Sequence, residues 1–309
     1  MLKYIGKRLL LMIPVMLGVI IIVFTLMYIT PGDPVDSILA GDMATPEAKA
    51  ALREELGLNG TYFERLFKYI KGLLTGDMGI DYITRVPVFT RIKETFPITL
   101  KVAFFATLAA TILGVTIGIL SAIKQYSIFD TIGMVIAMIG NSMPSFWEGL
   151  LFMLLFALRW KLLPSTGIGT WKHLVMPVMV TGTHAMASIA RMTRSSMLEV
   201  IRSDYITTAR SKGHVEWRVI LKHALPNALI PIITVVGLQF RHLLGGSVIS
   251  EAIFNVPGMG TLIIQAITAR NYQVVQGAIL VTSLALSIIN LVVDLLYSLV
   301  DPRIKSQYR

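Results

Sequence analysis

The long apolar runs of this chain are the feature that most restricts how it can fold. The first run, from Leu9 to Ile29, carries no charged residue over roughly 21 positions, which is about the length a helix needs to cross a bilayer. Hydrophobic residues make up 54% of the 309 residues and charged residues only 15%, whereas soluble domains carry about 25% charged residues. The sequence therefore predicts an integral membrane protein.

Six such runs predict an all-α fold with six membrane-spanning helices, because a backbone in lipid has to satisfy its own hydrogen bonds. The clearest cluster of positive charge lies in short segments that we assign to the cytoplasm, together with both the N- and the C-terminus. The net charge of +10 does not indicate nucleic-acid binding, since basic residues are scattered over span flanks and loops. After the first, the spans are expected at Val102 to Ile123, Thr131 to Leu158, Leu174 to Ala190, Ala228 to Ile249 and Gln276 to Val300.

We divide the chain into residues 1–30 with the first span, a structured external segment at 31–97, and a five-span core at 98–309 that includes a cytoplasmic loop at 194–227. In the external segment, Thr45-Pro46 is typical of a helix start and Gly57 of a helix end. Thr61 and Glu64 have the spacing of a capping box, which predicts a second external helix.

Two features inside the spans predict how the helices pack. Gly114, Gly118 and Ala122 recur every four residues, and small residues at this spacing let two membrane helices approach closely. Pro144 removes a backbone hydrogen bond in the third span, and the neighbouring Asn and Ser side chains can compensate for it. We therefore expect a kinked third span in preference to a re-entrant pair of helices.

The cytoplasmic stretch from Ser203 to Pro226 has clear helix boundaries of its own. Ser203 and Asp204 are favourable helix N-caps, and Gly213 suits the left-handed position that ends a helix. A second helical run, from Val215 to Leu225, is expected to end before Pro226. The sequence thus predicts two short helices that meet at a glycine corner.

This stretch resembles a known family. The spacing of Ala209, Gly213, His223 and Leu225-Pro226 is similar to that of the EAA loop of ABC-importer permeases. Thr207 and Thr208 stand where that family has Glu and Ala, and His223 replaces its usual Ile. The form TARSKG is similar to the dipeptide/oligopeptide/nickel branch, as are the sequences at 31–34, 251–260 and 301–303.

The resemblance implies a permease subunit in the cytoplasmic (inner) membrane, surrounded by lipid and without a cofactor. It implies a second permease subunit, two ABC ATPase subunits and an external substrate-binding protein as partners. The loop would form the coupling helix that docks on an ATPase. The external segment would then be a platform for the binding protein, a cap on the span ends, or both. The residues that carry coupling would be Asp204, Tyr205, Thr207, Thr208, Ala209, Arg210, Lys212 and Gly213.

Polar residues at membrane depth are the candidates for lining the transport pathway, because burying them in lipid is costly. We expect Arg241 to meet a substrate carboxylate or Glu148, and the alternatives are a structural ion pair or an extended side chain that reaches the membrane interface. Glu148 is expected to face either the pathway or a membrane interface. His184 is more typical of a hydrogen bond to a neighbouring helix than of a metal ligand, and no metal site is expected. The pathway candidates are Asn141, Ser142, Pro144, Glu148, Gln239 and Arg241.

The chain has no phosphate-binding G-x-x-x-x-G-K-[ST] sequence, so we expect its energy to come from ATPase partners and its own role to be non-catalytic. Peptides are the first expectation for the substrate, and nickel chelates or oligosaccharides are the alternatives within the same architecture. A stand-alone secondary transporter or channel would show broken helices in both halves. A membrane enzyme would need clustered acid, base or metal-binding groups.

Overall fold

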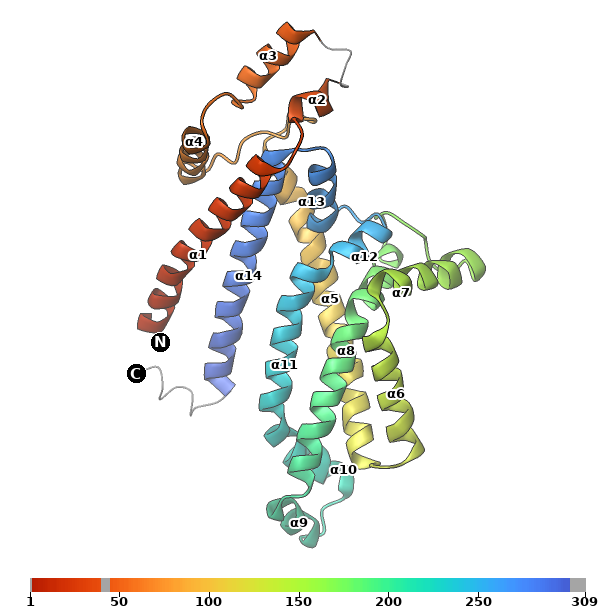
Figure 1. Ribbon diagram of the computed structural model, residues 1–309. Coiled ribbons are helices and arrows are strands. Elements are labelled where there is room, and N and C mark those ends of the chain that lie inside the picture. Colours follow the sequence, from red (N-terminus) through yellow and green to blue (C-terminus); the bar gives the residue numbers. More distant parts are fainter. Residues whose placement is uncertain (1, 40–44, 301–309) are drawn as a thin grey trace. The chain divides into compact units, whose positions relative to one another are not determined.

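The computed structural model of the protein describes residues 2–39 and 45–300, and within them the chain forms helices and no β-strand (Figure 1). The predicted all-α fold is thus confirmed for these residues, while the C-terminal 301–303 signature lies outside them. The helices are α1 (Leu2–Ile29), α2 (Pro34–Ile38), α3 (Pro46–Glu55), α4 (Tyr62–Leu74), α5 (Val88–Ile123), α6 (Ile128–Ser142), α7 (Ser145–Phe152), α8 (Lys172–Ile201), α9 (Asp204–Ser211), α10 (Glu216–Arg218), α11 (Leu225–Gly246), α12 (Val248–Ile253), α13 (Met259–Thr268) and α14 (Tyr272–Val300), with π-helical segments η2 (Met153–Arg159) and η3 (Val219–Ala224).

Four helical stretches among the described residues are long and apolar enough to cross a bilayer: Ile5–Ile29, Val88–Ile123, Glu216–Gly245 and Tyr272–Leu295. They correspond to the first, second, fifth and sixth predicted spans. In the region of the predicted third span, α6 is apolar but has only 15 residues, about 22 Å of helix. In the region of the fourth, α8 carries Arg191 and Arg194 in its second half.

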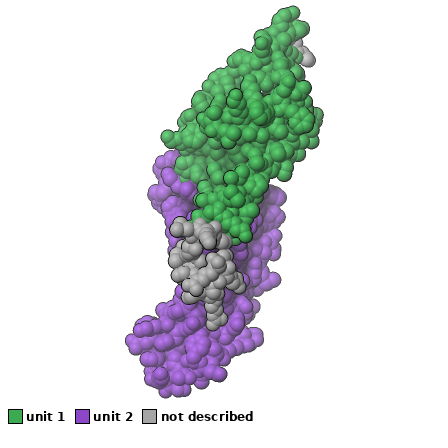
Figure 2. All heavy atoms as spheres, turned by 90° about the vertical axis from the view of Figure 1, so that its left-hand side faces the viewer, with its two compact units in different colours: residues 1–99, 257–288 green, residues 100–256, 289–309 purple. Residues whose placement is uncertain are grey.

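The described residues form two compact units, which Figure 2 shows in different colours. Unit 1 comprises the described parts of Met1–Thr99 and Pro257–Ile288, and unit 2 comprises Leu100–Val256 with the described part of Ile289–Arg309. The chain therefore leaves unit 1 within α5, close to the boundary that we expect at residue 97. It then returns to unit 1 for α13 and the first part of α14, a return that the sequence does not reveal.

Unit 1 is built around apolar side chains from α1, α5, α13 and α14, and a second cluster joins α2 and α3 to it. The first cluster buries Val23, Val88, Ile92, Met259, Leu262, Ala266, Val274, Val275 and Ala278. The second buries Val35, Leu52, Leu56, Tyr82 and Tyr272. The helices of the 31–97 segment are therefore packed structure and not a loose connection.

Local sequence signals place the helices of this segment correctly. The Thr45 hydroxyl accepts a hydrogen bond from the Ala48 amide at the start of α3. Gly57 follows the end of α3 with a φ of +65°. At α4, the Thr61 amide donates to Glu64 at 2.8 Å, and the Glu64 amide donates to the Thr61 hydroxyl at 3.4 Å. The predicted capping box is therefore confirmed.

In unit 2, α5 and α8 pack closely through glycines. A Cβ added at Gly118 would lie 2.5 Å from the Cβ of Thr193 and 2.7 Å from the carbonyl oxygen of Ala190. At Gly114 it would lie 2.8 Å from the carbonyl oxygen of Met186. The predicted small-residue contact of α5 is therefore confirmed, and its partner is α8.

We expected the third span to be one kinked helix, and this prediction was wrong, because the region forms two separate helices, α6 and α7. α6 ends at Ser142, Met143 and Pro144 are both extended with ψ of 131°, and α7 starts afresh at Ser145. Figure 1 shows α7 running across α6 and not along it. An extended residue before proline is expected on steric grounds, and Pro144 takes the N-cap position, where its missing N–H costs nothing.

Candidate coupling surface and pathway

The predicted coupling helix is present as α9, directly after the end of α8. Ser203 occupies the expected N-cap position with φ −77° and ψ 150°. Its hydroxyl, however, donates to the Val200 carbonyl at 2.6 Å and makes no cap bond to α9. The position of the helix start was predicted correctly, but the hydroxyl secures the end of the preceding helix instead.

Gly213 forms the corner that follows α9. Its φ is +78°, as predicted, and a Cβ added there would meet no atom within 4 Å. Glycine is therefore favoured at this position by the backbone conformation and not by a shortage of space. A substitution here acts on the geometry of the corner without disturbing a packed interior.

A bidentate ion pair closes the corner. The Nε and Nη2 atoms of Arg210 donate to the carboxylate of Glu216 at 3.1 and 2.7 Å. These hydrogen bonds raise the pKa of Arg210 and lower the pKa of Glu216. Arg210 was among the predicted coupling residues and Glu216 was not, because the two residues come together only when the chain turns at Gly213.

One side of α9 is anchored and the rest is exposed. Ile206 and Ala209 are buried in a cluster with Met197, Val219 and Ile220. Ala209 therefore faces the interior of unit 2, unlike the seven other predicted coupling residues, which are all exposed: Asp204, Tyr205, Thr207, Thr208, Arg210, Lys212 and Gly213. The arrangement presents a basic, polar helix surface on a rigid base.

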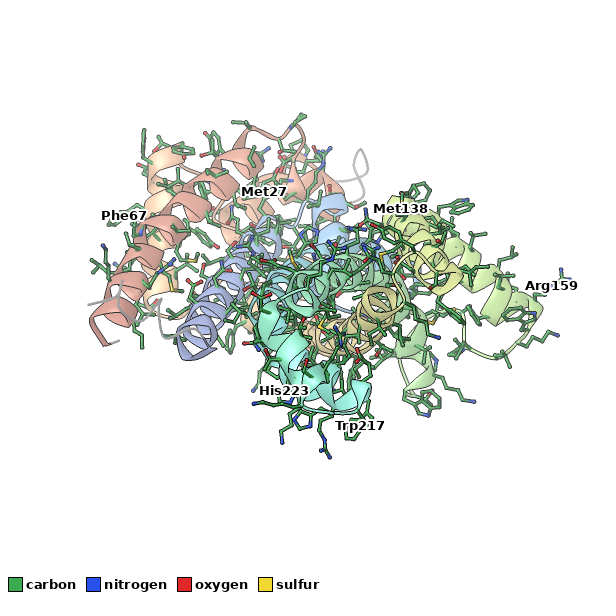
Figure 3. All side chains as sticks on the ribbon, turned by 90° about the horizontal axis from the view of Figure 1, so that it is seen from below. Met27, Phe67, Met138, Arg159, Trp217 and His223 are labelled. Atoms are coloured by element: carbon green, nitrogen blue, oxygen red, sulfur yellow. The ribbon has the colours of Figure 1, made fainter. Side chains whose placement is uncertain are left out.

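The stretch after the corner adds two features to this surface. Trp217 is 63% exposed and Val215 53% exposed, and Figure 3 shows Trp217 and His223 projecting at this end of unit 2. The ring of His223 also stacks on that of His214, with centroids 5.4 Å apart. Exposed apolar and aromatic residues beside charged ones are typical of protein-binding surfaces.

The helix does not end before Pro226, contrary to the prediction. The chain passes from α10 through η3 directly into α11, with Pro226 in the first turn of α11. Proline is tolerated there because the first helical N–H groups have no obligatory partner, and the π-helical segment absorbs the change in hydrogen bonding. The segment after the Gly213 corner is thus continuous with α11, the predicted fifth span.

A second bidentate ion pair ties α6 to α8. Arg194 donates through Nε and Nη2 to the two carboxylate oxygens of Asp130, both at 2.7 Å. Asp130 is buried and also accepts from the Tyr126 amide at 3.0 Å. Because α8 continues past Ala190 to Ile201, Arg194 lies within the helix and not at its end.

The predicted pathway residues do not come together at one place. Asn141, Ser142 and Pro144 are exposed around the α6–α7 turn. Glu148 is only 2% exposed, and its Oε2 atom has no hydrogen-bond partner. Arg241 is exposed on α11 and donates a hydrogen bond to the side-chain oxygen of Asn290 on α14 at 3.3 Å. Gln239 is half-buried on α11.

A cavity of about 230 Å³ lies between the elements that carry these residues. On its wall, the hydroxyls of Thr181 and Ser250 are 2.8 Å apart and hydrogen-bonded. Its lining residues are Ser145, Val180, Thr181, His184, His242, Leu243 and Ser250. Ser145 and His242 adjoin the predicted Pro144 and Arg241 in the sequence, but none of the six predicted pathway residues lines this cavity.

His184 was expected to bond a neighbouring helix, and it does. Its Nε2–H donates to the carbonyl oxygen of Met143 at 3.1 Å. That carbonyl lies in the extended α6–α7 turn, so α8 supplies the donor there. The neighbouring Asn and Ser side chains do not take this role. Among residues 2–39 and 45–300, no three His, Asp or Glu side chains converge as a metal site.

Comparison with known proteins gives full-length similarity to transport proteins. Residues 114–306 match the family "Binding-protein-dependent transport system inner membrane component", and residues 1–103 match "Binding-prot-dependent transport system membrane comp, N-term". The dipeptide transport system permease protein DppB of Alkalihalophilus pseudofirmus is 46% identical over 99% of this chain and 100% of that protein. DppB of Escherichia coli K12 is 40% identical over 99% of each chain. The glutathione transport system permease protein GsiC of Salmonella paratyphi A is also 40% identical over 99% of each chain.

Solved structures show a similar fold. The MetNI methionine ABC transporter in an inward-facing conformation has a TM-score of 0.60 at 19% identity, covering 69% of this chain and 97% of that chain. An amino acid ABC transporter has a TM-score of 0.53 at 18% identity, covering 70% and 94%. At this identity the likeness concerns the fold alone. Together with the two family matches, it leads to one conclusion: the chain belongs to the family of binding-protein-dependent transport system inner membrane components.

Proposed function

We propose that this chain is the permease subunit of an ATP-driven importer of peptides in the inner membrane. The observation that carries the proposal is the anchored helix α9 with its glycine corner, in a chain similar over its full length to dipeptide permeases. A second permease subunit, two ATPase subunits and an external substrate-binding protein complete the importer. This chain forms half of the translocation pathway and carries out no covalent chemistry.

Six crossings complete the membrane arrangement in this proposal. In this proposal α6 and α8 cross the membrane in addition to the four long apolar stretches, so both termini and α9 would lie in the cytoplasm. The basic residues of α9 and the following turn, Arg210, Lys212 and Arg218, support this orientation because short cytoplasmic loops favour Lys and Arg. The helices α2, α3 and α4 then lie outside, where the binding protein docks.

Coupling follows from the rigidity of the corner. Ile206 and Ala209 fix α9 to the lower part of unit 2, and the Arg210–Glu216 pair fixes its angle to the helix that becomes α11. An ATPase that closes on ATP and holds α9 moves this base as one piece. The transport pathway alternates between two states, and the ATPase biases their balance.

We assign the pathway side of unit 2 to the polar cavity between α7, α8, α11 and α12. Thr181, His184, His242 and Ser250 line it with hydrogen-bonding groups that can meet the polar backbone of a peptide. The orphaned carboxylate oxygen of Glu148 lies on α7, one of the elements that bound this cavity. Peptides are the preferred substrate class because the relatives of this length are named for dipeptide and glutathione transport.

The test compares two variants of Gly213. It uses cells in which the transporter that contains this chain is the only importer of a nutrient dipeptide. Gly213→Val places a β-branched residue in the left-handed region, which is strongly disfavoured, whereas Asn tolerates that region. We expect Gly213→Val to lose most uptake at normal membrane abundance and Gly213→Asn to retain it. Equal uptake by both variants would contradict the coupling role. Absence of peptide uptake by the wild-type chain would contradict the substrate class.

A further inference from the structure

The external helix α4 carries an exposed apolar stripe. Phe63 is 76% exposed, Phe67 71% and Leu74 84%. Their spacings of four and seven residues place them on one face of the helix. Phe67 lies on the outer side of the helix in Figure 3, away from the other elements of unit 1. A stripe of this size on a segment surrounded only by water would be costly.

Contacts with α1, the first membrane helix, fix the position of α4 along the length of that helix. The hydroxyl of Tyr62 is 2.7 Å from that of Thr25, and the ring of Phe24 contacts those of Tyr62 and Tyr69 at centroid distances of 5.5 and 6.2 Å. Thr25 lies about 6 Å along the helix from Ile29, where the apolar stretch of α1 ends. α4 is thus held beside the last turns of a span.

The orientation of α4 is also the one expected for a helix at the end of a membrane span. Figure 1 shows α4 almost end-on beside α1, so that it runs across the membrane span and not along it. The remaining sides of α4 carry Arg65, Lys68 and Lys71. The guanidinium of Arg65 lies 5.4 Å from the centre of the Tyr28 ring. Tyrosines with basic residues at one level are typical of the membrane–water interface.

We infer that α4 is an interfacial helix that lies in the lipid headgroup layer on the external face of the inner membrane. Its apolar stripe enters the boundary with the acyl chains, while Arg65, Lys68 and Lys71 line a cavity of unit 1 on the other sides of the helix. Amphipathic helices of this kind bury their apolar face about 5–10 Å into the interface, which agrees with the depth set by Thr25. The lipid surface would thereby hold α2, α3 and α4 at a fixed height, an anchoring role that goes beyond transport itself.

The absence of cysteine from the sequence allows a direct test. Phe67→Cys and, as the matched control on an adjacent side of the helix, Lys68→Cys are each given a nitroxide label. The labelled chain is assembled with its partner subunits in nanodiscs of zwitterionic and anionic phospholipids. Power-saturation spectroscopy then measures collision with oxygen, which concentrates in lipid, and with a water-soluble nickel chelate.

We expect the ratio of oxygen to nickel accessibility to be several-fold higher at residue 67 than at residue 68. Equal, high nickel accessibility at both positions would overturn the inference by showing a water-exposed stripe. Exclusion of both reagents at residue 67 would overturn it in favour of a protein partner. If Phe67→Cys does not assemble, Phe63→Cys on the same stripe gives the same readout, and peptide uptake by each variant is measured separately.

Discussion

At the scale of single residues, His184 shows how a break in a membrane helix is stabilised. The turn between α6 and α7 exposes the Met143 carbonyl, and the imidazole of His184 donates to it at 3.1 Å. An unsatisfied carbonyl away from water costs about 1–3 kcal/mol. The histidine therefore acts first as a structural donor, although it also lines the cavity.

Replacement of His184 tests this role. We expect His184→Phe to destabilise the protein by about 1–3 kcal/mol, because the carbonyl loses its donor. His184→Gln keeps an N–H donor on a flexible side chain and should recover part of the loss. Thermal unfolding in detergent, followed by loss of the monodisperse peak in size-exclusion chromatography, measures both. Equal melting temperatures for His184→Phe and the wild type would contradict the assignment.

A second residue-scale feature is the buried carboxylate of Asp81 in unit 1. Burial alone would raise the pKa of Asp81, but the amides of Ile83 and Thr84 and the side chain of Asn271 donate to it and hold that pKa below its ordinary value. The side-chain amide of Asn271 is 2.7 Å away. The network connects the loop before α5 to the start of α14.

This network predicts acid sensitivity. Because the pKa of Asp81 is lowered by folding, its stabilisation is fully present above the ordinary titration range of an aspartate and is lost as the pH falls through and below that range. Asp81→Asn should be less stable than the wild type at neutral pH, and the gap should narrow as the pH falls. Melting temperatures measured at a series of pH values test this. A gap that stays constant with pH would contradict it.

At the scale of helices, the α5–α8 contact depends on Gly118. The added Cβ of Gly118→Ala would lie 2.7 Å from a backbone carbonyl oxygen, which cannot move aside as a side chain can. We expect a loss of about 1–3 kcal/mol from overpacking. Gly18→Ala in α1 is the control, since its Cβ would meet nothing within 4 Å. If thermal unfolding shows the same small effect for both variants, the two helices are not packed as described.

Several helix ends were predictable because their signal lies within a few residues. Thr45, Thr61 with Glu64, and Gly213 are local signals, because a cap or a left-handed residue decides the backbone at its own position. The Gly114 and Gly118 repeat gave the existence of a contact but not its partner.

Pairs between distant segments could not be predicted from the sequence. Asp130 with Arg194 and Arg210 with Glu216 depend on how the chain turns, and each residue alone resembles an ordinary flanking charge. The structure at Pro144 also depended on a distant residue. His184 of α8 donates to the Met143 carbonyl, so the helix can end completely at this point and is not merely kinked. The same holds for Pro226, where a π-helical segment allowed the helix to continue.

At the scale of the whole molecule, the chain is one component of a larger machine. It belongs to a family of transport-system membrane components, and most side chains of α9 are exposed. The central claim is therefore that ATPase subunits bind this chain through α9.

The most direct test is to purify the tagged chain from its native membrane in mild detergent and to identify what accompanies it by mass spectrometry, with Gly213→Val purified in parallel. We expect two ATPase subunits and a second permease subunit to accompany the wild-type chain, and the ATPase subunits to be selectively lost with Gly213→Val. Recovery of the wild-type chain alone, from membranes in which it transports peptide, would contradict the account and indicate a self-sufficient transporter.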